Sequence, residues 1–403
     1  PEETGEFAEF LLKKSDGNAF IVKSYLQHIA REGLLRLEGG KWTWSIPELE
    51  KTLVPTDVVG FMKYKWNDVS NDAKPILAIA ACCGVEFNTE TIEELLDKDS
   101  TIPVSQVASI LDQSVGKGVL LALRQATYSF SHPKLRDMFR TMLPDQKQCE
   151  LHLKIGLSML NKFPSCDGPQ LLSILEHLNL GIPAISDDNV KYQLAELNLK
   201  AAMTAKFGAA IEETAQYLTI SLGLLGEGKA VWEVNPDRAF TVHKEALQVF
   251  LNIGSDKAIK VRETALTMLA NDALKKAQLQ IIDLSNLVLH GNHVEAIKHA
   301  ILMLSSFGIN LPDPDSEPAA MTMYTNEQHN ILESTWTRNV EELINLPVCT
   351  NEEHSIPINI IAHILECVLL AKPHLLLALT LAGINWCVKH GNNTFSPVIY
   401  ACH

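Results

Sequence analysis

The sequence has no C-x-x-C pair, although it contains eight cysteines scattered between Cys82 and Cys402. This scatter argues against a disulfide framework or a zinc site and favours reduced thiols in a cytosolic protein. Basic residues are also few, with 34 Lys and Arg against 48 Asp and Glu, which gives a formal net charge of -14. Because many cations must meet phosphates when a protein binds nucleic acid or an anionic membrane, we expect neither partner.

Catalytic motifs are absent as well. We find no G-x-S-x-G, no H-E-x-x-H and no kinase catalytic motif. His290 and His293 flank a turn, and His363 and Cys367 stand one helical turn apart, but neither pair has carboxylates or cysteines at ligand spacing. Helix packing explains these pairs better than metal binding. We therefore expect no catalytic centre and no metal site in this chain, and leave open whether a longer parent protein is an enzyme.

A long unbroken hydrophobic run is missing too. The most apolar segment, Ile356 to Val388, is interrupted by His363, Glu366 and the residues around Pro373. Each uninterrupted stretch is shorter than the ~20 residues that a bilayer span requires. Proline is tolerated at the start of a helix and not in its interior. We predict two buried helices that meet near Pro373, no membrane segment and a cytoplasmic location.

The length of 403 residues suits two or three domains, and 46% apolar residues can form sizeable cores. The chain begins at Pro1 without an initiator Met and stops at His403 without a terminating signal. We interpret it as an internal piece of a longer protein. Its function is then a share of the function of that parent.

What the sequence does contain is helical periodicity. Apolar residues recur at spacings of three and four through 151–160, 171–178, 240–251 and 281–289. This pattern predicts a mainly α fold.

Signals for strands are confined to the first third of the chain. Apolar residues alternate on both sides of Gly39-Gly40, which predicts a hairpin over 35–44. A second hairpin is predicted for Val119 to Leu123 with Thr127 to Ser131, with Tyr128 and Phe130 on one face.

Four helices are predicted around the second hairpin, near 71–83, 89–97, 105–115 and 134–143, with Ser105 as the N-cap of the third. Helices followed by a β-wing describe a winged-helix domain over about 67–145.

Repeats occupy the chain after residue 146. Helix-turn-helix units are predicted over 191–225, 237–270 and 278–307, and each turn contains a glycine followed by Ala-Ile. We expect Gly291 to adopt a positive φ in its turn. A further His-Gly-Asn at 390–392 indicates a fourth unit. The pattern predicts a tetratricopeptide-like (TPR-like) α-α superhelix.

One segment satisfies the first part of a phosphate-binding P-loop. Gly223 to Lys229 reads G-x-x-x-x-G-K, but Ala230 stands where a Ser or Thr would coordinate Mg²⁺. A P-loop must also follow a buried strand, whereas Ile211 to Leu225 has helical spacing. A helix that ends in glycines explains the segment better.

A succession of short motifs resembles a known family. In order along the chain it resembles the AAA/STAND-type ATPase region of large signalling proteins, which lies between a serine/threonine-kinase-like domain and C-terminal GAF and histidine-kinase domains. The motifs that carry the resemblance are Gly17-Asn18-Ala19-Phe20, Lys41-Trp42-Thr43-Trp44, Tyr128 to His132, Leu151 to Gly156, Ala195 to Leu199, Trp232-Glu233 and Gly308 to Pro312.

The resemblance implies a domain order and a nucleotide. Residues 1–66 correspond to the ATPase lid, 67–145 to its winged helix and 146–403 to a TPR-like region. The P-loop and the acidic Walker B residue then lie upstream of Pro1, so ATP or ADP with Mg²⁺ is a cofactor of the parent and not of this chain alone.

The resemblance also implies four nucleotide-binding candidates, Gly17, Asn18, Ala19 and His132. The histidine corresponds to one that meets the β-phosphate of ADP in related ATPases. Two positions depart from the family pattern, because Ala19 stands where the family has Pro and Pro133 where it has Asp.

Three functions stay open from the sequence. The chain is a regulatory segment that relays nucleotide state in a signalling ATPase-kinase, a passive TPR-like adaptor, or part of an ATPase-coupled transcription regulator. In the first two, protein partners bind the helical repeats. In the first, the adjoining ATPase and kinase domains of the parent are partners too.

Overall fold

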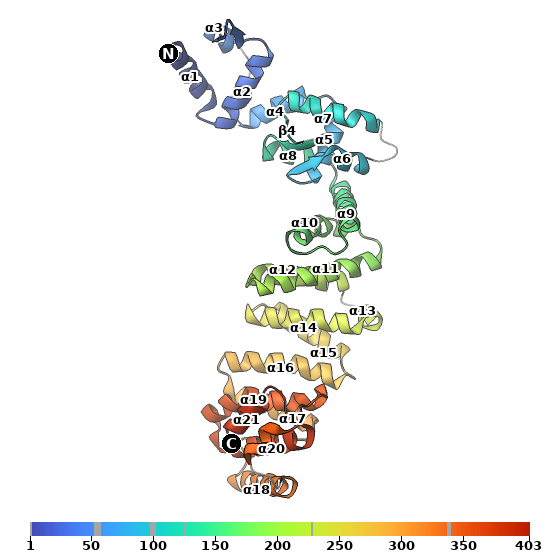
Figure 1. Ribbon diagram of the computed structural model, residues 1–403, viewed down its shortest axis with the longest axis vertical. Coiled ribbons are helices and arrows are strands. Elements are labelled where there is room, and N and C mark those ends of the chain that lie inside the picture. Colours follow the sequence, from blue (N-terminus) through green and yellow to red (C-terminus); the bar gives the residue numbers. More distant parts are fainter. Residues whose placement is uncertain (1, 52–57, 97–101, 125, 227–228, 337–339) are drawn as a thin grey trace. The chain divides into compact units, whose positions relative to one another are not determined.

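The computed structural model describes the chain except for residues 1, 52–57, 97–101, 125, 227–228 and 337–339. Its fold is mainly α, as predicted (Figure 1). The chain divides into two compact units, Pro1–Lys191 and Tyr192–His403, and each is described by itself.

The first unit begins with two helices and a hairpin around a small aromatic core. Phe7 stacks on Trp44 at 4.6 Å between ring centroids, and Tyr25 and Ile29 are buried beside them. The predicted hairpin is confirmed, with φ of 58° at Gly39 and 79° at Gly40. The elements are α1 (Glu2–Ser15), α2 (Ala19–Arg31), β1 (Arg36–Glu38), β2 (Lys41–Thr43) and α3 (Ile46–Glu50).

Helices and a three-stranded antiparallel sheet follow in the same unit. The sheet has the order β3-β5-β4, and its Phe87 pairs with Tyr128 across the strands. The predicted second hairpin and all four predicted helices are present. The elements are α4 (Val58–Asp68), α5 (Ala73–Cys82), β3 (Glu86–Asn88), α6 (Thr89–Leu95), α7 (Val107–Gly116), β4 (Leu120–Arg124), β5 (Thr127–Phe130) and α8 (Pro133–Arg140).

Two local expectations in this region were wrong or incomplete. Ser105 is not the N-cap of α7, because it lies in a 3-10 turn, Val104–Gln106, and α7 begins after Gln106. Within that turn, Gln106 N–H donates to Pro103 O at 2.9 Å, and the start of α7 has no side-chain cap. Strand β3 was not predicted, since three residues are too few to show an alternating pattern.

The first unit ends in a helical hairpin that buries two histidines. The helices are α9 (Asp145–Lys162) and α10 (Gly168–Leu180). The Nδ1 atoms of His152 and His177 lie 3.0 Å apart, so one donates a hydrogen bond to the other. Burial lowers the pKa of both rings, and for His152 the pKa falls to about 4, with His177 and Arg140 adding to the effect. Both histidines are therefore neutral at pH 7.

This pair predicts a loss of stability in acid. In the folded state His152 resists protonation until about pH 4, whereas its ordinary pKa is 6.5, so the unfolded chain binds more protons as pH falls from 6.5. Between pH 7 and pH 5 we expect the free energy of unfolding to fall by about 2 kcal/mol. Urea titrations at both pH values measure this.

The double variant His152→Leu/His177→Leu should lose most of that pH dependence, whereas His329→Gln, on an exposed surface, should keep it. An unchanged pH dependence in the double variant would contradict the assignment.

The second unit is a succession of antiparallel helices, and Figure 1 shows α12, α14 and α16 stacked one after another. A large core lies among α16, α17, α19 and α20. The helices are α11 (Asp188–Phe207, beginning four residues before the boundary), α12 (Ile211–Leu225), α13 (Lys229–Val234), α14 (Pro236–Asn252), α15 (Lys257–Met268), α16 (Ala273–Leu289), α17 (His293–Ser306), α18 (Pro318–Thr335), α19 (Glu352–Ala371), α20 (Leu376–His390) and α21 (Ser396–Ala401).

The turns between these helices follow the predicted glycines with one exception. Gly254 and Gly291 have φ of 64° and 72°, which confirms the positive φ expected for Gly291. In the first turn the left-handed residue is Ala209, with φ of 57°, and not Gly208. Helix α11 extends through Phe207, and the N–H of Ala210 reaches back to Ala205 O at 3.0 Å, which places Ala209 at the left-handed position.

Gly391 is the most constrained of these turn residues. It follows α20 with φ 95° and ψ 174°, a region that side chains avoid. A Cβ there would collide with the carbonyl oxygen of Pro347. After the turn, Asn392 forms a parallel bridge with Val348, and Cys349 N–H donates to Asn392 O at 2.7 Å.

We expect Gly391→Ala to lower the free energy of unfolding by about 3 kcal/mol, since backbone strain and a steric clash add. Gly291→Ala should cost only about 1 kcal/mol, because that position has a positive φ but open space around it. Urea unfolding of the two variants tests the ranking. An equal loss of unfolding free energy in the two variants would show that the backbone at Pro347 moves to make room for the new side chain.

Helix α19 corrects the expectation that polar residues divide the apolar segment into short stretches. It is 20 residues long, continues through His363 and Glu366, and is long and apolar enough to cross a membrane. It is also half buried within the unit, where Ile360, Ile361 and Ile364 pack in the core with α17 and α20. The predicted pair of buried helices is confirmed, with a 3-10 turn at Pro373–Leu375 between them.

Candidate interaction groove

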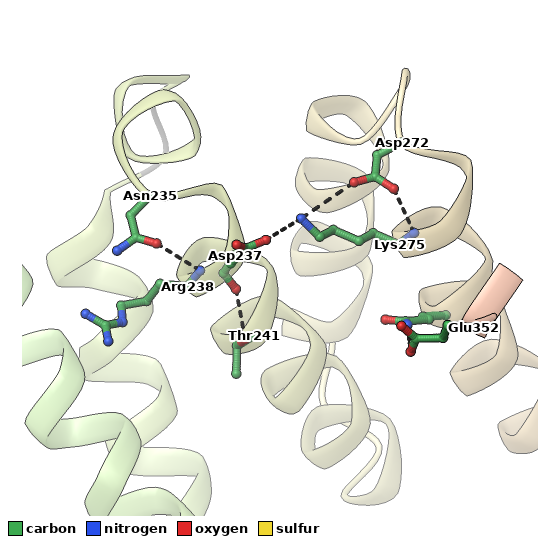
Figure 2. A network of polar contacts seen from close by, with 8 residues as sticks. Asn235, Asp237, Arg238, Thr241, Asp272, Lys275 and Glu352 are labelled. Atoms are coloured by element: carbon green, nitrogen blue, oxygen red, sulfur yellow. Dashed lines mark hydrogen bonds and ion pairs between the residues drawn. The ribbon is translucent and has the colours of Figure 1, made fainter. Parts of the chain in front are cut away.

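Polar side chains join consecutive helices along one edge of the second unit (Figure 2). Lys275 Nζ of α16 lies 2.6 Å from Asp237 Oδ1 of α14 and 3.5 Å from Asp272 Oδ2. The hydrogen bond from Lys275 to Asp237 is the main reason that the pKa of Lys275 is raised. Asp272 also accepts the backbone N–H of Lys275 at 3.0 Å and so caps the start of α16.

The same edge continues to the helices on either side. Arg238 of α14 pairs with Glu196 of α11, and Gln278 of α16 donates to Glu352 of α19 at 2.7 Å. The side chain of Asp237 is 85% exposed, so its ion pair contributes at most about 1 kcal/mol. The Asp237–Lys275 ion pair therefore links neighbouring helices but adds little to their stability.

Beside this edge, α14, α16 and α19 form a groove with a volume of about 380 Å³. Its walls carry aliphatic side chains, among them Leu251 and Ile281, and one charge of each sign, Lys244 and Glu352. The remaining polar lining is rich in amides, namely Gln248, Asn252, Gln278, Asn286 and Asn359.

Some of these amides already have partners. Gln248 accepts from Lys206 Nζ at 3.1 Å, and Asn359 Oδ1 accepts from Asn393 at 2.8 Å. Within the described part of the chain, the amides of Asn252 and Asn286 have no hydrogen-bond partner. Each amide offers two N–H donors and an acceptor oxygen, which match the C=O and N–H of a peptide group. The groove is thus suited to an extended polypeptide of low net charge.

The residues that the family resemblance assigned to nucleotide binding lie in two places in the first unit. Gly17, Asn18 and Ala19 lie together in the turn from α1 to α2. Gly17 has φ 75°, and Asn18 Oδ1 accepts the N–H of Ile21 at 3.3 Å. Ala19 is the first residue of α2. The side-chain oxygen of Asn18 therefore has a local role at the start of that helix.

His132 lies apart from that turn in the sequence, at the N-cap of α8. Its Nδ1 accepts the backbone N–H of Lys134 at 3.1 Å. Burial and the nearby Lys134 charge lower the pKa of His132, so the ring is neutral at pH 7 with its proton on Nε2. The ring caps the helix through Nδ1, and Nε2–H is a donor of the kind that a phosphate oxygen accepts.

The cap predicts a stability effect for this histidine. His132→Ala should lower the free energy of unfolding by about 1 kcal/mol, because the Lys134 N–H loses its side-chain partner. His132→Asn should be close to neutral, since Asn is a good N-cap residue. Urea unfolding of the chain as given compares them, and equal losses in the two variants would contradict the capping role.

The side chains of the two sequence pairs, His290 with His293 and His363 with Cys367, contact partners outside their own pair. His363 Nδ1 bonds to Asn359 O at 2.7 Å, and His290 Nδ1 to Asn286 O at 2.8 Å, each one turn earlier on its own helix. Cys367 instead meets His293, with 3.2 Å between Sγ and Nδ1. Among the described residues no group of three or more His, Cys, Asp or Glu could hold a metal ion.

The P-loop-like segment is helical where the structure describes it. Gly223 lies in α12, and Gly226 ends that helix with φ 75°. Residues 227–228 lie outside the described part, and α13 begins at Lys229. The prediction of a helix that ends in glycine is confirmed, and a strand does not precede the motif.

Comparisons with known proteins give one similarity. No family model matches the chain, and no solved structure matches it. The chain is 22% identical, over 335 residues, to hybrid signal transduction histidine kinase G of Dictyostelium discoideum. That similarity covers 68% of this chain and 10% of the kinase. The chain is therefore similar to a small part of a large signal-transduction protein.

Proposed function

We propose that this chain is a regulatory relay segment of a multidomain signal-transduction protein of the hybrid histidine kinase type. The amide-lined groove of α14, α16 and α19 carries this proposal, because it offers a built surface for a protein partner. The similarity to a hybrid histidine kinase supports a role in signalling. In this proposal the protein lies in the cytoplasm, with α19 as a core helix.

The domain order that we propose follows the resemblance to AAA/STAND-type ATPases. Residues 1–66 form the lid, 67–145 a winged helix and 146–403 a TPR-like array. The three-stranded sheet packed with α5 to α8 supports the winged helix, and the repeated glycine turns support the array.

Nucleotide would be held mainly by an upstream ATPase core of the parent. Of the four candidate residues, His132 carries an imidazole N–H, a donor of the kind that a phosphate oxygen accepts. Asn18 already uses its side-chain oxygen at the start of α2, and Gly17 and Ala19 offer only backbone atoms. ATP or ADP would bind with Mg²⁺ to the upstream ATPase core. The identity of the bound nucleotide would be the signal that this chain relays.

A relay requires a region of the protein whose conformation changes when a partner binds. In the groove, a bound polypeptide would contact α14, α16 and α19 at once and so fix their spacing. The exposed ion pairs along the edge are weak enough to allow that spacing to adjust. Partner binding at the groove would then favour one arrangement of the array over others.

A passive adaptor is the second candidate. The capping roles of Asn18 and His132 favour it, since both residues have a structural reason to be present without nucleotide.

The groove predicts a specific peptide-binding defect. Asn252→Leu/Asn286→Leu should weaken binding of peptides selected on the wild-type chain by about 10- to 100-fold, because two amide hydrogen bonds are lost. Peptides are selected from a displayed random library, and their affinities are measured by calorimetry. The control Asn161→Leu/Asn189→Leu makes the same change on exposed positions outside the groove. Equal affinities for groove and control variants would rule out the groove.

The same groove variant separates relay from adaptor. It is placed in the longer parent protein, and histidine autophosphorylation is measured with and without a selected peptide. A response to peptide that the groove variant loses supports the relay. Loss of peptide binding with unchanged phosphorylation would leave the adaptor as the function.

A further inference from the structure

A second cavity lies away from the groove, on the other side of α14. It has a volume of about 350 Å³ and is formed by α12, α14 and α15. A volume of this size lies within the range of small-molecule sites. Its floor is apolar, with Leu222, Phe250 and Val261.

Two glycines of the P-loop-like segment form part of its wall. Gly223 and Gly226 both line the cavity, and a Cβ at either position would meet no atom within 4 Å. Gly223 lies inside α12, where glycine is less favourable than alanine. No neighbouring atom is close enough to exclude a larger side chain at this position. Gly223 therefore leaves open space on the cavity side of α12.

Two of the polar residues that line the cavity carry positive charge. Lys257 and Lys260 lie at its rim, one turn apart on α15, with the hydroxyl groups of Thr219 and Thr264 nearby. Lys257 Nζ contacts the neutral Thr219 hydroxyl at 3.3 Å and lies 5.8 Å from the centre of the Phe250 ring. Among the described lining residues there is no carboxylate. This contrasts with a chain whose net charge is -14.

A buried histidine completes the lining. His243 is 5% exposed, and its ring packs against Trp232 with centroids 5.0 Å apart. Its Nδ1–H donates to Ala239 O at 2.7 Å, and burial lowers its pKa, so the ring is neutral. The lone pair of Nε2 is then left to accept a hydrogen bond from a ligand.

We propose that this cavity binds a small organic anion, with its apolar body over Leu222 and Phe250 and its anionic group at Lys257 and Lys260. The apolar floor and cationic rim match the two parts of such a molecule. A neutral His243 favours a ligand that also carries an N–H or O–H donor. This site is independent of the groove and of the function proposed for it.

The test uses two fluorescent probes that differ only in charge. Anilinonaphthalene sulfonate is an aromatic anion with an N–H group, and phenyl naphthylamine is the same molecule without the sulfonate. Dissociation constants are measured by fluorescence titration of the full chain. Lys257→Gln/Lys260→Gln should reduce the preference for the sulfonate over the amine by about tenfold. Higher ionic strength should weaken sulfonate binding in the wild type.

A second variant tests the cavity itself. Gly223→Leu places a side chain in the open space and should weaken both probes at least tenfold, while its helix is preserved. The control Lys51→Gln/Lys276→Gln removes the same charge from exposed positions outside the cavity and should change neither affinity. The proposal is overturned if the sulfonate shows no saturable binding, or if its affinity is unchanged in either cavity variant.

Discussion

The burial of apolar helix faces between consecutive antiparallel helices is the constraint on which the second unit depends. The apolar face of a helix is buried by more than one neighbour. Thus α17 packs on α19, α19 packs on α20, and α20 packs on α18. The pairs must therefore reverse direction at fixed points, and residues with positive φ such as Gly254, Gly291 and Gly391 make those reversals possible. Stacking in this way leaves other helix faces uncovered, and the groove and the cavity both lie on such faces.

Local features of this fold could be predicted well from the sequence. Periodicity and glycine positions gave the helices and most of the turns, because both depend on residues close together in the chain. Predictions were wrong at helix ends, where backbone hydrogen bonds rather than residue type set the local turn. Ala209, rather than Gly208, takes the left-handed position, and a 3-10 turn replaces the Ser105 cap.

The sites were much less predictable. The amides of the groove come from three helices, and Gln278 meets Glu352 from 74 positions away. His293 and Cys367 are also 74 residues apart. Pairings of this kind depend on how helices stack, and a single sequence carries no periodic signal for them. The segment that begins at Gly223 resembles a phosphate loop in sequence, but only the fold shows that Gly223 and Gly226 line a cavity with two lysines.

The polar edge shown in Figure 2 is held together differently from the apolar seams between the helices. The apolar seams between helices resist separation, since pulling them apart exposes core side chains to water. The ion pairs of Asp237 and Arg238 lie in solvent, where ions screen them over about 8 Å at physiological salt. We therefore expect this edge to open more readily than the apolar seams between the helices.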